Sequence, residues 1–116
     1  MTQNPNRKIR VTPRARDDLK NIGRYTEQTW GKAQRNQYLK SIDARFHWLA
    51  ENPQLGKHRI DICEGYYSFP EGQHVIFYLI GNNAINIIGI PHKEMDIISY
   101  FMEDWSPKPS WKNKKS

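Results

Sequence analysis

The sequence predicts an α+β domain in which an antiparallel helical hairpin packs on a three- to four-stranded antiparallel sheet. Apolar side chains recur at helical spacing over residues 13–30 and again over residues 32–51. Residues 66–90 then hold three short runs that are rich in aromatic and β-branched side chains and are separated by turn-forming residues. A chain of 116 residues is long enough for one modest hydrophobic core, so we expect a single domain.

The first predicted elements are an N-terminal strand over residues 7–11 and the helix that follows it. Thr12 offers a hydroxyl at the N-cap, and Pro13 occupies the first helical position, where a missing N–H leaves no hydrogen bond unmade. Asp17 and Asp18 are interpreted as first-turn carboxylates that interact favourably with the positive end of the helix dipole. The apolar face of this helix contains Ala15, Leu19, Ile22, Thr26 and Trp30.

A second helix is predicted from about Lys32 to Glu51. Gly31 stands between the two helices, at a position where a left-handed C-cap is common, so the chain is expected to reverse there. Pro53 ends the second helix, because the residue before a proline is pushed out of the helical region. The apolar face of this helix contains Tyr38, Leu39, Ile42, Phe46 and Leu49.

Three strands follow as a meander. Tyr66–Phe69 and His74–Ile80 flank a turn that we assign to Pro70–Gly72, since proline presets the backbone and glycine accepts a positive φ. The second run is apolar on both alternating faces, which is typical of a central strand covered on both sides. The turn signal at residues 81–83 leads to a last strand over Ala84–Ile90.

The two ends of the chain differ in composition from its centre. A short amphipathic helical segment is predicted over Glu94–Met102. Residues 103–116 carry prolines, serines and lysines that cannot form a core, so we expect a mobile basic tail. Residues 1–6 are predicted to be flexible, which leaves residues 7–102 as the folded domain.

The charge is unevenly distributed along the chain. The formal net charge is +6, but residues 1–60 hold 13 Lys and Arg against five Asp and Glu. Residues 61–102 hold one basic residue against five acidic ones, and the remaining tail holds four against two. A basic surface of this kind suits a nucleic acid, an acidic protein partner or a solvated face, and charge alone leaves these possibilities open.

Several classes of protein are disfavoured by what the sequence lacks. No stretch approaches the ~20 apolar residues that span a bilayer, and no secretory signal is visible at the N-terminus. The lone Cys63 has no partner for an internal disulfide, and the four histidines match no metal-ligand spacing. We therefore expect a cytoplasmic protein that has no cofactor, no metal and no membrane contact.

Five pieces of the sequence occur in an order that resembles the ParE family of the RelE/ParE superfamily, which comprises the toxins of bacterial type II toxin–antitoxin modules. The pieces are VTP at residues 11–13, YTEQTWG at 25–31, LAENPQLG at 49–56, GYYSFPEGQHVIFY at 65–78 and HKEMD at 92–96. The resemblance extends from about Ile9 to Ile98 and implies the same fold of a helical hairpin on an antiparallel sheet.

The resemblance implies a non-catalytic toxin that binds DNA gyrase and traps its cleaved-DNA complex, so that replication is blocked. Topoisomerase IV is left open as a target. The resemblance also implies a ParD-like antitoxin with a ribbon-helix-helix domain and a disordered acidic arm that folds on the toxin. DNA would be contacted only through the antitoxin or through gyrase.

We place the antitoxin along the helical hairpin and the adjoining edge of the sheet, from residue type and position alone. Cationic side chains there would pair with an acidic arm, and apolar side chains would anchor it. The candidates are Arg10, Arg14, Leu19, Ile22, Arg24, Tyr25 and Trp30.

A second function, ribosome-dependent cleavage of mRNA, belongs to relatives in the same superfamily. Metal-free cleavage needs a base, an acid and cations near the phosphate. The candidates here are His92, Tyr78 and Arg59, but no lysine or arginine occurs between Ile60 and His92. We expect Tyr78 to belong to the core with its hydroxyl at the surface, and His92 to brace the terminal segment.

The tail extends beyond the usual end of the family and carries Trp105 and Trp111. Exposed tryptophans are good interface anchors, so both are candidates for contacting gyrase; the alternatives are a solvated tail or one tryptophan packed on the sheet. A third class of function is a degenerate, non-toxic module that retains only antitoxin binding.

Overall fold

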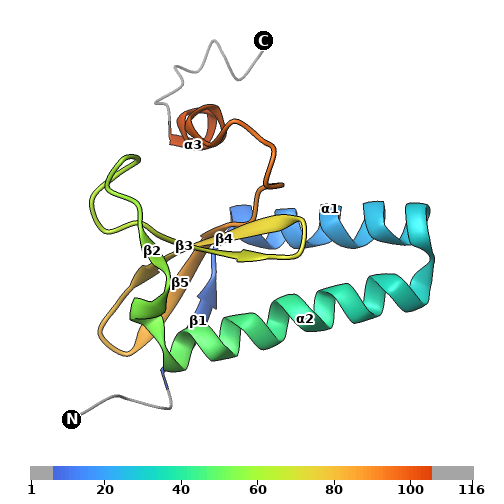
Figure 1. The fold of residues 1–116 in the computed structure, drawn as a ribbon, viewed down its shortest axis with the longest axis horizontal. Helices are drawn as coiled ribbons and strands as arrows, with labels where there is room; N and C mark the ends of the chain where they lie inside the picture. Colours follow the sequence, from blue (N-terminus) through green and yellow to red (C-terminus); the bar gives the residue numbers. More distant parts are fainter. Residues whose placement is uncertain (1–6, 106–116) are drawn as a thin grey trace.

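The structure is a computed structural model, and it describes residues 7–105 (Figure 1). The helical hairpin consists of α1 (Pro13–Trp30) and α2 (Lys32–Glu51), with the bounds that the sequence predicted. Gly31 has the positive φ expected of the glycine at this reversal, 96°, but its ψ of 170° differs from the left-handed helical C-cap that the sequence predicted. The remaining elements are β1 (Lys8–Val11), the 3-10 turn η1 (Pro53–Leu55), β2 (Lys57–His58), β3 (Tyr67–Glu71), β4 (His74–Ile80), β5 (Ala84–Gly89) and α3 (Ile97–Trp105).

The sheet has five strands in the order β1-β5-β4-β3-β2. The predicted antiparallel meander is β3-β4-β5, and the two-residue β2 adds a further antiparallel strand at one edge. The N-terminal strand β1 pairs in parallel with β5, with Lys8 opposite Ala84 and Val11 opposite Ile87. The sequence pattern did not reveal this parallel pairing, because both helices and three strands lie between the two partners.

The β3–β4 turn begins two residues later than predicted and ends one residue later. Pro70 belongs to β3, and the turn is formed by Gly72 and Gln73 between the paired residues Glu71 and His74. Gly72 has a φ of 60°, which a two-residue hairpin loop requires at its first central position. Pro70 is tolerated in the strand because the facing residue, Val75, directs its N–H away from β3 to Pro91, which makes Pro70 and Val75 a non-hydrogen-bonded pair. The nitrogen of Pro70 therefore points to the outer side of β3, beyond the residues that pair with β2, where no strand of the described residues needs a donor.

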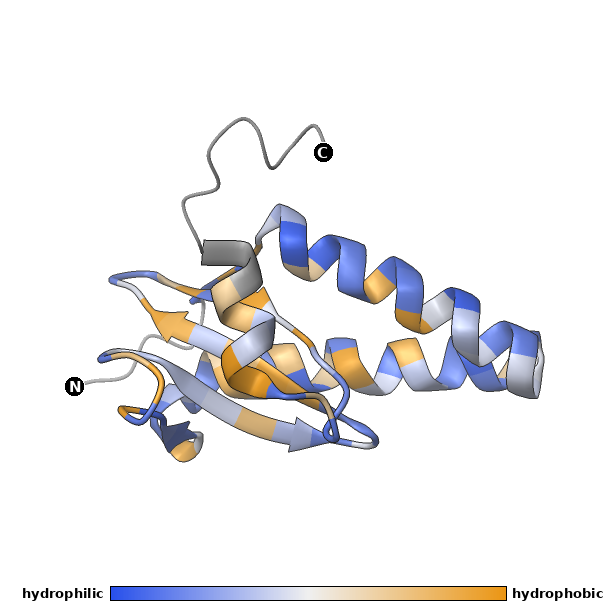
Figure 2. Cartoon of the chain, turned by 90° about the horizontal axis from the view of Figure 1, so that it is seen from above, coloured by the Kyte–Doolittle hydropathy of each residue, from blue (hydrophilic) through white to orange (hydrophobic). Residues whose placement is uncertain are grey.

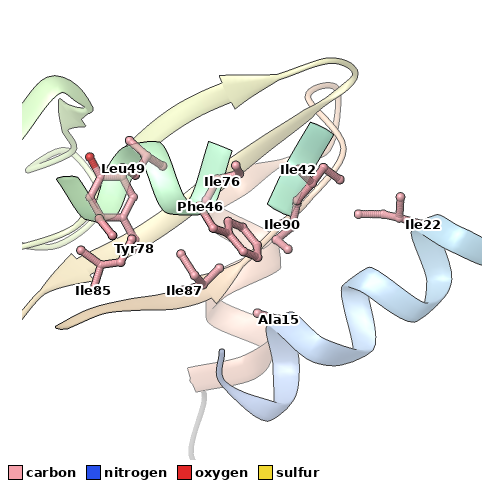
Figure 3. Packing of buried hydrophobic residues seen from close by; sticks show 11 residues of the cluster. Ala15, Ile22, Ile42, Phe46, Leu49, Ile76, Tyr78, Ile85, Ile87 and Ile90 are labelled. Carbon is pink, nitrogen blue, oxygen red and sulfur yellow. The ribbon is translucent and has the colours of Figure 1, made fainter. Parts of the chain in front are cut away.

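The main core lies between the helical hairpin and the sheet, where buried residues of α1, α2, β4 and β5 meet (Figure 3). The central strand β4 is covered on both faces, as predicted. Ile76 and Tyr78 face the helices, whereas Phe77 faces α3 and packs with Tyr100 and Phe101. Burying a large apolar side chain completely stabilises the fold by about 1.5–3 kcal/mol. The helical hairpin on one face of the sheet and α3 on the other therefore both stabilise the sheet.

The predicted exposure of the Tyr78 hydroxyl is wrong. The residue is fully buried, and its hydroxyl donates to the carbonyl of Pro53 at 2.7 Å and accepts from the N–H of Gly56 at 3.1 Å. The turn η1 folds over this end of β4 and replaces solvent as the hydrogen-bonding partner.

The interpretation of Asp17 and Asp18 as first-turn carboxylates is also wrong. Because α1 begins at Pro13, both residues lie in the second turn of the helix. Asp18 accepts hydrogen bonds from the N–H of Ile90 at 2.8 Å and from the Tyr100 hydroxyl. Its carboxylate therefore joins α1 to the end of the sheet and to α3.

The C-terminal helix α3 is shifted by three residues from the predicted range of 94–102. It begins later because the carboxylate of Asp96 accepts hydrogen bonds from Ile98 and Ser99 and so caps the helix. It also continues to Trp105, so residues 103–105 are helical and do not belong to the predicted tail.

The predictions for residues 1–6 and 106–116 lie outside the described residues. Within residues 7–105, none of the helices has the length and apolar character needed to cross a membrane.

Candidate functional site

A groove of about 710 Å³ lies between α1, the β3–β4 turn and the segment that follows β5. One wall is a face of α1, where Asp18, Ile22, Tyr25, Thr26 and Trp30 recur at helical spacing. The facing wall includes Tyr38 from α2, the turn residues 72–74, residues 90–92, Met95 and Tyr100. We refer to this feature below as the groove.

The groove exposes large apolar side chains. Tyr25 is 64% exposed, Trp30 is 70% exposed and Met95 is 47% exposed. The helical hairpin extends past the sheet, so the distal turns of α1 have no strand to pack on (Figures 1 and 2). Apolar side chains that gather in an open groove are typical of a surface that binds another molecule.

Tyr38 fixes the wall formed by the β3–β4 turn. Its hydroxyl accepts from the N–H of Gln73 at 2.9 Å and lies 2.7 Å from Nδ1 of His74 and 3.2 Å from the carbonyl oxygen of Glu71. Burial raises the pKa of the Tyr38 hydroxyl above its ordinary value. The Glu71 carboxylate accepts from Nε of Arg45 at 2.8 Å, which holds the turn to α2 a second time.

Two histidines stand side by side in the same wall. The ring centroids of His74 and His92 are 5.4 Å apart, in an edge-to-face arrangement. Burial and the neighbouring His92 lower the pKa of His74 to about 4, against an opposing effect of Asp18. Nδ1 of His92 accepts from the N–H of Glu94 at 3.1 Å, so His92 braces the terminal segment as predicted.

The end of the groove near α3 is closed by an aromatic contact. The Arg14 guanidinium lies 3.7 Å from the centre of the Tyr100 ring, and the Tyr100 hydroxyl donates to Asp18. Burial and the Asp18 carboxylate raise the pKa of Tyr100. These contacts fasten α3 to α1.

The residues predicted to bind an antitoxin are distributed unevenly around the groove. Ile22, Tyr25 and Trp30 line it, and Arg14 borders it through Tyr100. Leu19 packs against the main core, Arg24 is exposed on α1 and donates to Asn21, and Arg10 lies on β1 opposite Asn86. Sequence reasoning missed the facing wall, although the family-like ending at residues 92–96 already contained His92 and Met95.

The three candidate nuclease residues are not brought together. Tyr78 faces the helices with a buried hydroxyl, whereas Arg59 lies on the opposite face, 5.5 Å from the centre of the Phe77 ring. The Arg59 guanidinium is also paired with the Asp61 carboxylate at 3.0 and 2.9 Å. His92 pairs with His74 at the start of β4, four residues or about 13 Å along the strand from Tyr78.

Aromatic rings fill the sheet face that turns away from the helical hairpin. Phe101 of α3 packs edge-on against Phe77 at 5.0 Å and against Tyr66 at 5.3 Å, measured between ring centroids. Tyr100 contacts Phe101 at 4.8 Å. Within the described residues, no cluster of three or more His, Cys, Asp or Glu is placed to hold a metal ion.

The two tryptophans proposed to contact gyrase receive no structural account. Trp105 is the last residue of α3, and Trp111 lies outside the described residues. Their role remains a prediction.

Comparison with known proteins places the chain among bacterial toxins. Residues 9–97 match the family model described as the ParE toxin of the type II toxin–antitoxin system, parDE. The chain is 34% identical over 87 residues to Toxin ParE1 of Caulobacter vibrioides, and 31% identical over 88 residues to Toxin ParE1 of Mycobacterium tuberculosis. Each alignment covers 75% of this chain and 90% of the relative.

Two solved structures share the fold. A chain from the chromosomal ParDE TA system of P. aeruginosa superposes with a TM-score of 0.66 at 16% identity, covering 78% of this chain and all of that one. A chain of the YoeB dimer from Staphylococcus aureus gives a TM-score of 0.56 at 22% identity, covering 75% of this chain and 97% of that one. The family-model match over residues 9–97 and the identity to the two ParE1 toxins show that the chain belongs to the ParE family of toxins of type II toxin–antitoxin systems.

Proposed function

We propose that this toxin acts by binding DNA gyrase and trapping its cleaved-DNA complex, and that it does not cut RNA. The observation that carries the proposal is the dispersal of Tyr78, Arg59 and His92 over the two faces of the sheet. General acid–base catalysis requires its groups within hydrogen-bond reach of one substrate, a few ångströms at most. A binding mode of action requires no such constellation.

The charges of the sheet support the same proposal. Negative charge that builds up on phosphorus must be stabilised by nearby cations, and losing one such group costs about 3–4 kcal/mol of transition-state stabilisation. No lysine or arginine occurs from Ile60 to His92, and Arg59 is already paired with Asp61. The sheet is therefore better suited to support the helices than to perform phosphate chemistry.

We further propose that a ParD-like antitoxin neutralises the toxin by laying an acidic arm into the groove. Tyr25 and Trp30 offer apolar anchors there, and the excess of basic residues before position 60 favours a negatively charged partner. The similar P. aeruginosa structure comes from a ParDE system, which supports a partner of this class. Ordering such an arm costs about 2–5 kcal/mol, which the burial of apolar anchors offsets.

Gyrase inhibition is tested by supercoiling of relaxed plasmid with purified gyrase. We expect the toxin to prevent supercoiling, and the toxin mixed with its antitoxin to restore it. Complete supercoiling at a molar excess of free toxin would contradict the proposal.

The nuclease alternative predicts a different pair of results. Messenger RNA would be cut during translation, and His92→Ala would abolish toxicity while the protein stays folded. The non-toxic alternative predicts unaffected growth when the chain is expressed without antitoxin in a sensitive host. Gyrase-dependent toxicity that survives His92→Ala excludes both.

A further inference from the structure

The two groove histidines differ in what their hydrogen bonds allow. Nδ1 of His92 accepts from the N–H of Glu94, so the proton of the neutral ring resides on Nε2. His92 therefore presents an N–H donor at Nε2.

His74 has a partner that serves its ring in either protonation state. The Tyr38 hydroxyl, 2.7 Å from Nδ1 of His74, donates to that atom when the ring is neutral. When the ring is charged, the same oxygen accepts from Nδ1–H and turns its own proton to the carbonyl of Glu71, 3.2 Å away. His74 can thus gain a proton without losing its hydrogen bond.

The remaining nitrogen of each ring is open to a ligand. Within residues 7–105, Nε2 of His74 and Nε2 of His92 have no hydrogen-bond partner, and neither atom is sealed from solvent. Both residues line the groove, with ring centroids 5.4 Å apart. A carboxylate between the rings can accept from both nitrogens, because each of its two oxygens has free lone pairs.

The acidic groups that face the histidines each accept hydrogen bonds from other residues, Asp18 through Oδ2. Asp18 of α1 accepts from Ile90 and Tyr100, and Glu71 at the end of β3 accepts from Arg45. The other titratable groups around the pair are Tyr38 of α2, Tyr100 of α3, and Lys93 and Glu94 in the segment after β5. The open polar atoms of the pair are therefore N–H donors, which suit an anion.

We propose that His74 and His92 form a carboxylate-binding site in the groove, which receives an Asp or Glu side chain of the antitoxin arm while His74 takes up a proton. The inference rests on the proposed neutralisation by an acidic arm and names the polar contact that positions it.

The site links binding to pH in a defined direction. Free His74, with a pKa of about 4, is neutral at pH 7. A carboxylate against Nε2 favours the charged ring and raises that pKa, so the complex holds more protons than the free partners. Affinity for the arm therefore rises as the pH falls toward about 5.5. The gain is up to about tenfold for each pH unit by which the pH falls below the pKa of His74 in the complex.

The test uses a synthetic peptide of the acidic arm of the ParD-like antitoxin that neutralises the toxin, titrated calorimetrically at about pH 7.5 and about pH 5.5. We expect wild-type toxin to bind the peptide about three- to tenfold more tightly at the lower pH. His74→Gln keeps a hydrogen-bonding partner for Tyr38 but cannot gain a proton, so its gain in affinity at the lower pH should be clearly smaller than that of wild-type toxin. His92→Ala loses the Nε2 donor and should bind more weakly at both pH values.

Two controls separate this site from general effects of charge. His47→Gln removes an exposed histidine paired with Asp43 on α2 and should leave the pH dependence intact. A peptide with Gln in place of its acidic residues should bind wild-type toxin independently of pH. An unchanged pH dependence in His74→Gln would overturn the site while leaving neutralisation by the antitoxin standing; failure of every ParD-like antitoxin to neutralise the toxin would overturn both.

Discussion

Buried tyrosine hydroxyls tie the loops of this domain to its sheet. Tyr78 bridges Pro53 and Gly56 at one end, and Tyr100 binds Asp18 at the other. A buried hydroxyl that makes such bonds adds little net stability, but removing it leaves its partners unpaired at a larger cost. These two residues therefore serve as structural joints, and neither is available for chemistry on a substrate.

Tyr78→Phe tests this assignment, because it removes the hydroxyl and keeps the ring. We expect a loss of about 1–3 kcal/mol in the free energy of unfolding, measured by urea denaturation. Tyr67→Phe is the matched control, since Tyr67 stacks on Tyr78 at 5.6 Å between ring centroids and is only half-buried. Equal stability of the two variants would contradict the structural role.

The same hydroxyls predict a loss of stability in alkali. Burial raises the pKa of Tyr78 to about 12, and those of Tyr38 and Tyr100 are raised as well. The folded state holds these protons more tightly than the unfolded chain, whose tyrosines ionise near pH 10. Their contribution is therefore complete below about pH 10 and is lost as the pH rises toward 12.

Urea midpoints measured across this range, together with the ultraviolet absorbance of tyrosinate, check the prediction. We expect part of the tyrosine absorbance change to coincide with unfolding. If all six tyrosines ionised near pH 10 while the protein stayed folded, the buried hydrogen bonds would be refuted.

The hydrogen-bond partners of individual side chains were the feature that the sequence predicted least well. The apolar run around Tyr78 predicted its burial, but the partner of its hydroxyl comes from a turn that the sequence shows only as a loop. The position of Asp18 near the start of a helix suggested an interaction with the helix dipole. Its actual partners, Ile90 and Tyr100, lie more than 70 residues away in the sequence and could not be inferred from it. Local patterns carry no record of contacts at such separations.

At the scale of elements, the β3–β4 turn depends on its contact with α2. A Cβ added to Gly72 would lie 2.5 Å from a ring carbon of Tyr38, and the glycine also has a positive φ. Tyr38 in turn holds Gln73 and His74, so the turn and one wall of the groove form a single unit.

Gly72→Ala should destabilise the protein through both strain and collision. Gly65→Ala is the matched control, because Gly65 has a φ of +91° but no atom within 4 Å of an added Cβ. We expect about 1–2 kcal/mol of destabilisation from the conformation alone in Gly65→Ala, and a larger loss in Gly72→Ala. Thermal unfolding of both variants decides the point, and an equal loss would exclude the contact with Tyr38.

The elements themselves were well predicted where the signal is local. Both helices of the hairpin begin and end where Pro13, Gly31 and Pro53 indicated. The turn after β3 was misplaced because Pro70 is typical of turns, and its acceptance in a strand depends on which way Val75 directs its N–H. The parallel pairing of β1 followed from no local signal.

At the scale of the whole molecule, the groove arises because the helical hairpin is longer than the sheet that it covers (Figure 1). The sequence identified the α1 wall through Ile22, Tyr25 and Trp30. It did not identify the facing wall, which is assembled from α2, the β3–β4 turn and the segment after β5, and therefore depends on tertiary packing.

Trp30→Ala tests the groove as the antitoxin site. We expect the arm peptide to bind about tenfold more weakly, which corresponds to about 1.4 kcal/mol, because exposed aromatic anchors dominate such interfaces. Folding should be unaffected, since Trp30 is 70% exposed. Ile60→Ala, which alters a similarly exposed side chain outside the groove lining, should bind the peptide normally; equal weakening in both variants would argue against the groove.

The central claim, that the toxin acts by binding gyrase, is tested most directly by measuring cleaved DNA. Purified toxin is incubated with gyrase and plasmid, the reaction is stopped with detergent and protease, and linear DNA is quantified. We predict that linear DNA accumulates with toxin concentration, requires gyrase, persists with His92→Ala and disappears when the antitoxin is added. Undiminished supercoiling without linear DNA at a molar excess of active toxin would contradict the claim.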